Sequence, residues 1–215
     1  MLRDILHCIP GDDLRSVRDR ALLAFGMAGA FRHSELVALR FADLERVPEG
    51  LRVIIRRSKT DQDGAGAVIA IPEGRRLRPK ALLEAWIARA GIADGFLFRR
   101  LTTSRAGGSA GASAAGNGSA VGIDVVVTPT GVVTPYPMSD RAVARLVQAR
   151  ARAAGYAGED FAGHSLRAGF LTAAARSGAS VFKMREVSRH KSMQVLADYV
   201  RDAELFRDHA GEGFL

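Results

Sequence analysis

The chain has 215 residues, 47% of them hydrophobic, which is enough to bury a substantial core in one main domain. Lys and Arg number 31 against 23 Asp and Glu, so the formal net charge is +8 at pH 7. This excess favours a polyanionic partner such as nucleic acid, although charge alone is equally compatible with a role in solubility. Cys8 is the single cysteine, which excludes an internal disulfide and a four-thiolate zinc cluster. No segment approaches the roughly 20 apolar residues of a membrane span, so we expect a cytoplasmic protein without membrane contact.

Helical periodicity dominates the start of the chain. Apolar residues at helical spacing predict a helix over 13–27, with Asp12 or Asp13 as its N-cap. A second helix is predicted to begin near Ser34. Two further helices are expected at about 79–90 and, after Ser139 as N-cap, at 140–154.

A change of periodicity after residue 44 predicts an antiparallel hairpin. Its strands are the β-branched runs at 51–55 and 67–71, which a turn-rich segment at 61–66 separates. Lys59 lies at the loop end of this hairpin. The predicted fold class is therefore α+β, mainly α with a small antiparallel hairpin or sheet.

Two later segments are harder to assign. Residues 104–122 are almost entirely Gly, Ala, Ser and Asn, a composition typical of a flexible insertion. The valine runs at 125–127 and 132–133 form either a small hairpin or an extended arm. From Ser165 onward the pattern predicts short helices ending in a helical tail, with breaks near Gly178, near Lys191 and after Tyr199.

Four separated clusters hold polar residues that a packing helix would not need. In chain order they are FRHSEL at 31–36, SKT at 58–60, GHSLR at 163–167, and RHKS at 189–192 followed by Tyr199. Their order resembles the tyrosine recombinase (phage integrase) family, whose fingerprint is a G-x-R-x-S-E-like helix start, a hairpin Lys, H-x-x-R, and then H-K-S and Tyr. The resemblance spans nearly the whole chain. Ala30 stands where the first motif usually has Gly.

The resemblance implies that Tyr199 is the nucleophile and that Arg32 and Arg167 hold the scissile phosphate. Attack on a phosphodiester builds negative charge on the nonbridging oxygens, and this charge must be stabilised. A guanidinium suits that task because its planar fork donates two parallel hydrogen bonds and remains protonated. The phenol, with a reference pKa of about 10, needs such cationic neighbours to be activated at neutral pH.

The family pattern assigns the remaining roles to two histidines, a lysine and a glutamate. His164 matches the proton-handling histidine, and His190 matches the residue that donates a hydrogen bond to the scissile phosphate. Lys59 matches the general acid that protonates the departing 5′ oxygen. Glu35 matches a supporting residue that orients a catalytic side chain through a hydrogen bond.

The resemblance also implies the architecture and the partners. The fold expected is the integrase-like catalytic domain of DNA breaking-rejoining enzymes, as a single domain over 1–215 with the insertion at about 104–122. The N-terminal core-binding domain usual in the family is expected to be absent. We expect double-stranded DNA as partner, and a homotetramer on DNA or a monomer when free. The tail at about 201–215 either docks onto a neighbouring subunit or packs on its own domain. Because the phosphotyrosine retains the bond energy, no cofactor or metal is expected.

Two other interpretations are compatible with parts of this pattern. One is a type IB topoisomerase-like enzyme, which shares phosphotyrosyl chemistry but relaxes DNA without pairing two sites. The other is a catalytically silent DNA-binding module of the same fold. Taken singly, Tyr199 is an ordinary half-buried aromatic and Arg32 an ordinary surface charge. All seven residue types in the family's order argue against coincidence and favour the recombinase.

Overall fold

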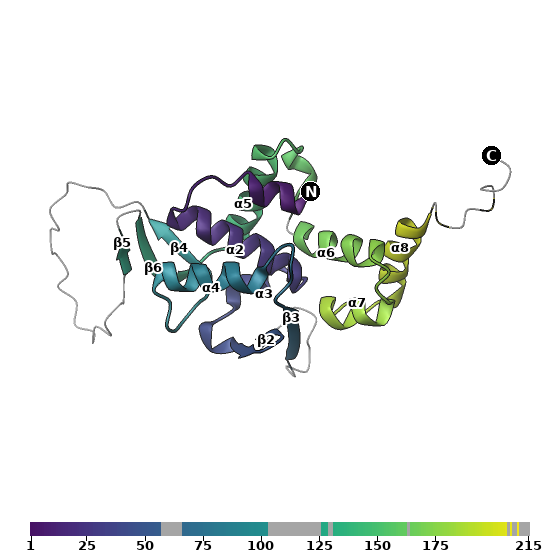
Figure 1. The fold of residues 1–215 in the computed structure, drawn as a ribbon, viewed down its shortest axis with the longest axis horizontal. Coiled ribbons are helices and arrows are strands. Elements are labelled where there is room, and N and C mark those ends of the chain that lie inside the picture. Colours follow the sequence, from purple (N-terminus) through teal and green to yellow (C-terminus); the bar gives the residue numbers. More distant parts are fainter. Residues whose placement is uncertain are drawn as a thin grey trace.

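The computed structural model describes residues 1–56, 66–102, 126–128, 131–162, 164–205, 207 and 210. Helices make up most of this part of the chain, and small antiparallel sheets accompany them (Figure 1). The helices are α1 (Leu2–His7), α2 (Leu14–Ala28), α3 (His33–Ala38), α4 (Pro79–Ala90), α5 (Asp140–Ala153), α6 (Ser165–Arg176), α7 (Val181–Ser188) and α8 (Met193–Glu204), with the 3-10 turns η1 (Phe41–Asp43) and η2 (Gly158–Asp160). The predicted α+β class is confirmed.

Helix α2 is the central element of the main core. Asp13 caps it by accepting hydrogen bonds from the backbone N–H groups of Arg15 and Ser16, as the sequence predicts. Apolar side chains such as Leu22 and Phe25 are fully buried, and α2 packs against both α4 and α6. The predicted helices at 13–27, 79–90 and 140–154 are all present to within a residue.

The first sheet contains the predicted hairpin. Strands β2 (Gly50–Ile55) and β3 (Ala67–Pro72) pair antiparallel, and every second residue of β2 from Leu51 is buried. A further strand, β1 (Leu44–Val47), adds to the β2 edge and was not predicted. Its sequence, LERV, offers too short an alternation to be recognised. The hairpin loop at 57–65, with Lys59, lies outside the described residues.

The second sheet settles the choice at 125–133 in favour of a hairpin. Strands β5 (Val126–Thr128) and β6 (Gly131–Pro137) pair antiparallel. Strand β4 (Arg99–Thr102), which was not predicted, pairs with the other edge of β6 and gives the order β4-β6-β5. The insertion expected at 104–122 lies outside the described residues.

Helices α6, α7 and α8 form a second, smaller hydrophobic cluster beside the main core (Figure 1). The predicted breaks near Gly178 and Lys191 are confirmed, but the break after Tyr199 is wrong. Helix α8 runs through Tyr199 to Glu204 because Leu196, Tyr199, Val200 and Ala203 share one face and pack into this cluster. Of the tail expected at 201–215, α8 covers the first four residues. None of the described helices combines the length and apolar character needed to cross a bilayer.

Candidate active site

The turn between α2 and α3 is the structural base of the site. It is closed by a hydrogen bond from the Phe31 N–H to the Gly26 carbonyl, and Ala30 within it has φ of 46°. This left-handed conformation costs an alanine about 1 kcal/mol or more, which accounts for the glycine usual at this position. The Ala30 carbonyl accepts hydrogen bonds from Arg167 Nη1 (2.9 Å) and Arg189 Nη2 (3.3 Å). The turn therefore connects α6 and the end of α7 to the start of α3.

Glu35 is the carboxylate shared by two arginines. Its side chain is fully buried, and Oε1 accepts a hydrogen bond from Arg32 Nη1 at 2.6 Å. Oε2 accepts from the Arg32 backbone N–H at 2.9 Å and from Arg189 Nη2 at 2.7 Å. Both carboxylate oxygens are engaged, so Glu35 fixes the orientation of Arg32 at the start of α3.

Arg167 lies in the first turn of α6 and contacts His190, which follows α7. The Arg167 side chain is buried, and its Nη2 lies 3.3 Å from His190 Nδ1. Burial and the positive charges of Arg32 and Arg189 lower the pKa of Arg167 to about 10. The guanidinium still carries its charge at neutral pH, in a position where a bound phosphate would relieve the repulsion among the arginines.

The surroundings of His190 determine its tautomer. Burial, followed by the charges of Arg167, Arg32, Arg189 and His164, lowers the pKa of His190 to about 4, so the ring is neutral at pH 7. Arg167 can only donate hydrogen bonds, so Nδ1 is the acceptor in their contact. The proton of the neutral ring is then on Nε2. His190 thus presents an N–H donor from the side of the ring that faces away from Arg167.

This lowered pKa predicts a pH dependence of stability. Between the ordinary value of 6.5 and the folded-state value of about 4, the unfolded chain binds more protons than the folded one. The free energy of unfolding should therefore fall as the pH is lowered through this range, by roughly 1–2 kcal/mol from His190 after solvent screening. Urea unfolding of wild type, His190→Gln and the exposed control His7→Gln at several pH values measures this. The free energy of unfolding should depend less steeply on pH in His190→Gln than in wild type and His7→Gln. Equal pH dependence in all three proteins would show that His190 does not have a lowered pKa.

The Nδ1 atom of His190 has a second neighbour, the hydroxyl of Ser188, at 2.9 Å. Ser188 is completely buried at the end of α7. Together with the Arg167 contact, this hydroxyl restricts rotation of the imidazole ring. The ring is therefore held at a defined orientation before any substrate is bound.

Tyr199 and His164 lie at the edge of this network. Tyr199 is half-buried on α8 and packs into the cluster that this helix forms with α6, the helix that carries Arg167. His164 is exposed at the start of α6 and lines, with Arg32, His33 and Asp140, a cavity of about 500 Å³. Among the residues predicted for the site, Lys59 lies outside the described residues.

Arg189, which is not among the predicted site residues, belongs to the same network. This residue ends α7 in a left-handed conformation, with φ of 57°, and its guanidinium lies 5.5 Å from the centre of the Phe31 ring. It contacts Glu35, the Ala30 carbonyl and the Gly29 carbonyl. Nothing in the sequence distinguished Arg189 from a surface cation beside His190, because Glu35, Ala30 and Gly29 are all more than 150 residues away.

His33, to which the family pattern assigns no role, lies beside His164. It is buried in the wall of the same cavity, and its Nε2 atom has no hydrogen-bond partner among the described residues. Burial lowers the pKa of His33, so its ring is neutral there.

Comparisons with known proteins agree with this geometry. The model of the phage integrase family matches residues 2–205. An integrase/recombinase xerD homolog of Selenomonas ruminantium is 32% identical over 201 residues, covering 93% of this chain and 51% of that protein. The chain thus spans about half the length of this curated relative.

Solved structures show the same fold at low sequence identity. The XerH site-specific recombinase bound to its palindromic difH substrate superposes with a TM-score of 0.66 at 15% identity, covering 95% of this chain and 48% of that one. The Tn1549 transposon integrase in complex with transposon right end DNA gives 0.58 at 15% identity, with 94% and 62% covered. The catalytic-domain fold expected from the sequence is thereby confirmed.

Proposed function

Because the chain belongs to the phage integrase family, we propose that it is the catalytic domain of a tyrosine site-specific recombinase. It cuts double-stranded DNA and rejoins it through a 3′-phosphotyrosyl intermediate. The observation that carries this proposal is the convergence of Arg32, Arg167 and His190 on one buried scaffold, with Tyr199 on α8, the helix that packs against the helix of Arg167.

In the proposed reaction the Tyr199 hydroxyl oxygen attacks the scissile phosphorus and the bond to the 5′ oxygen breaks. The tyrosine proton passes to His164, and Lys59 supplies a proton to the departing oxygen. A free 5′-hydroxyl then attacks the phosphotyrosine, which restores the DNA backbone and the tyrosine. The number of phosphoester bonds is unchanged at every stage, so the cycle needs no external energy source.

Arg32, Arg167 and His190 stabilise the transition state in this scheme. The two guanidinium groups offset charge on the nonbridging oxygens, and the Nε2–H of His190 donates to one of them. Glu35 and Arg189 do not touch the substrate. They hold Arg32 and the end of α7 in fixed positions, so that the hydrogen-bond donors for the phosphate are in place before DNA binds.

An Arg32→Lys variant tests the proposed role of Arg32 in holding the scissile phosphate. Lysine keeps the positive charge but loses the planar fork, so DNA affinity should change little while single-turnover cleavage slows by about 10²–10³-fold. Arg52→Lys, on the exposed face of β2, is the matched control and should leave cleavage unchanged. A slowdown shared by both variants, or absent from Arg32→Lys, would contradict the role.

The topoisomerase-like alternative is not favoured, because the matching family is that of phage integrases and the xerD homolog is an integrase/recombinase. We further propose that the domain acts in the cytoplasm and assembles as a homotetramer on two DNA sites. The free protein is then a monomer, which sedimentation with and without DNA would test.

A suicide substrate tests the proposed function directly. A duplex carrying DNA that flanks the native gene, nicked beside the candidate cleavage position, is incubated with the protein in EDTA and resolved on a denaturing gel. We expect a covalent protein–DNA adduct that accumulates because the nicked fragment diffuses away. DNA binding without any adduct would favour the silent DNA-binding module instead, and relaxation of supercoiled plasmid without site preference would favour the topoisomerase.

A further inference from the structure

A basic cavity of about 620 Å³ lies between α2, β4 and α5, outside the candidate active site. The charged residues that line it are Arg15, Arg18, Asp19, Arg100, Arg145 and Arg150. Five arginines against one aspartate leave a formal excess of four positive charges in a single depression. Such a concentration of one sign of charge attracts an anion.

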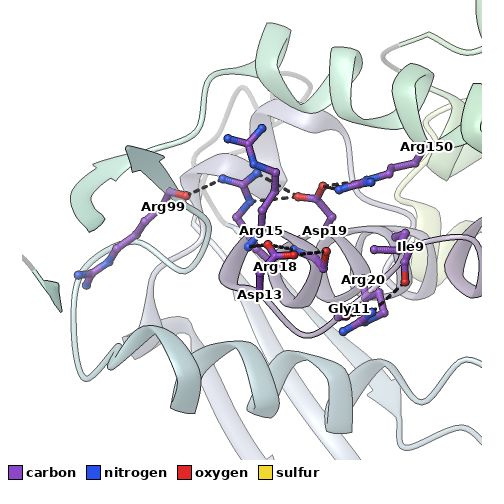
Figure 2. A network of polar contacts seen from close by, with 10 residues as sticks. Ile9, Gly11, Asp13, Arg15, Arg18, Asp19, Arg20, Arg99 and Arg150 are labelled. Atoms are coloured by element: carbon purple, nitrogen blue, oxygen red, sulfur yellow. Dashed lines mark hydrogen bonds and ion pairs between the residues drawn. The ribbon is translucent and has the colours of Figure 1, made fainter. Parts of the chain in front are cut away.

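The floor of the cavity is an ion-pair network that supports the fold. Figure 2 shows Asp19 between Arg18 and Arg150. Asp19 Oδ1 accepts from Arg18 at 3.0 Å, and Oδ2 accepts from Arg150 at 2.7 Å. Arg18 also donates to the Arg99 carbonyl at 3.4 Å. This network joins α2 to α5 and β4, and it occupies both oxygens of the carboxylate that lines the cavity.

The rim carries three exposed arginines from three different elements, Arg15 on α2, Arg100 on β4 and Arg145 on α5. Arg100 donates through Nε to the Pro137 carbonyl at 2.9 Å. Within the described residues, none of the three forms an ion pair with a carboxylate. The only carboxylate among the described residues that line the cavity is already engaged by Arg18 and Arg150, so the three exposed guanidinium groups make the cavity suited to an anion.

The cavity adjoins the candidate active site across α5. Arg141 lines the cavity that contains Arg32 and His164, and Arg145 lines the basic cavity. Residues four apart on a helix are neighbours on its surface, and both of these side chains are exposed. A DNA backbone that reaches the candidate active site therefore passes close to the rim of the basic cavity.

We propose that the basic cavity binds a backbone phosphate of the substrate DNA, at a position other than the scissile phosphate. The inference rests on the proposed function, because the ligand is its substrate. Guanidinium groups suit this ligand since they donate paired hydrogen bonds to phosphate oxygens. The contact is independent of base sequence and positions the duplex without reading it.

The test uses Arg15→Ala/Arg145→Ala, a double variant that leaves the Asp19 network intact. The control is Arg76→Ala/Arg185→Ala, which removes two exposed arginines elsewhere and lowers the net charge equally. Binding of a fluorescein-labelled random-sequence duplex is followed by anisotropy at several salt concentrations. We expect the cavity variant to bind about 10-fold more weakly, with the slope of log K against log salt reduced by about 1. The control should bind within about twofold of wild type.

Two results would overturn the proposal, namely unchanged affinity of the cavity variant or equal weakening in both double variants. The suicide-substrate adduct separates this failure from failure of the proposed function. If wild type forms the adduct and the cavity variant binds normally, only the cavity assignment is wrong. If the cavity variant alone loses affinity and wild type forms no adduct, the cavity assignment holds and the recombinase proposal fails.

Discussion

The Tyr199→Phe variant is expected to bind DNA as wild type does and to form no covalent adduct. Phenylalanine keeps the ring that packs in the cluster of α6, α7 and α8 but has no oxygen to attack phosphorus. Removal of a nucleophile should slow single-turnover cleavage by about 10⁴-fold or more. The measurement is adduct formation on the suicide substrate, with anisotropy on the same duplex to establish binding.

Tyr136→Phe is the matched control, because Tyr136 is exposed on β6 and has no place in the proposed chemistry. It should form the adduct at the wild-type rate. Persistence of the adduct in Tyr199→Phe would mean that another group is the nucleophile. Loss of DNA binding in that variant would mean instead that the hydroxyl serves recognition.

Glu35→Gln should destabilise the fold and slow cleavage together. Both Glu35 oxygens accept hydrogen bonds from arginine, and glutamine replaces one of them with a donor while removing the negative charge. Two largely buried guanidinium groups then lose the counter-charge of a fully buried carboxylate, for which we expect a loss of about 3–5 kcal/mol in the free energy of unfolding. Urea unfolding measures the stability. Cleavage is measured in single-turnover assays under conditions in which the variant is still folded.

Glu45→Gln supplies the comparison for this prediction. Glu45 pairs with Arg52 at 3.0 Å on the exposed face of the first sheet, where solvent screens the charges. Its replacement should change the free energy of unfolding by at most about 1 kcal/mol. Similar losses in the two variants would show that Glu35 acts as an ordinary surface partner.

Much of the fold could be predicted because its signals are local. Asp13 before a helical apolar pattern marks the start of α2, and strict alternation marks the hairpin of β2 and β3. Strands β1 and β4 escaped prediction because they are short, charged and stabilised by their neighbours in the sheet. The predicted break after Tyr199 was wrong for a similar reason, because the continuation of α8 depends on packing against α6 and α7.

In the candidate site, too, only the features with a local sequence signal could be predicted. Residue types and their order pointed to Arg32, Arg167, His190 and Tyr199, since phosphoryl transfer restricts which side chains can serve. The part played by Arg189 could not be predicted, because it depends on a left-handed backbone and on a carboxylate 154 residues away. The basic cavity likewise exists only where α2, β4 and α5 meet.

Mass spectrometry of the adduct shows whether DNA becomes covalently joined to Tyr199. The adduct from the suicide substrate is digested with nuclease and protease, and the peptide that carries the residual nucleotide is sequenced by fragmentation. We predict a phosphodiester on the Tyr199 oxygen, on the peptide from α8. A nucleotide on Tyr136, on Tyr156 or on any other side chain would mean that Tyr199 is not the nucleophile.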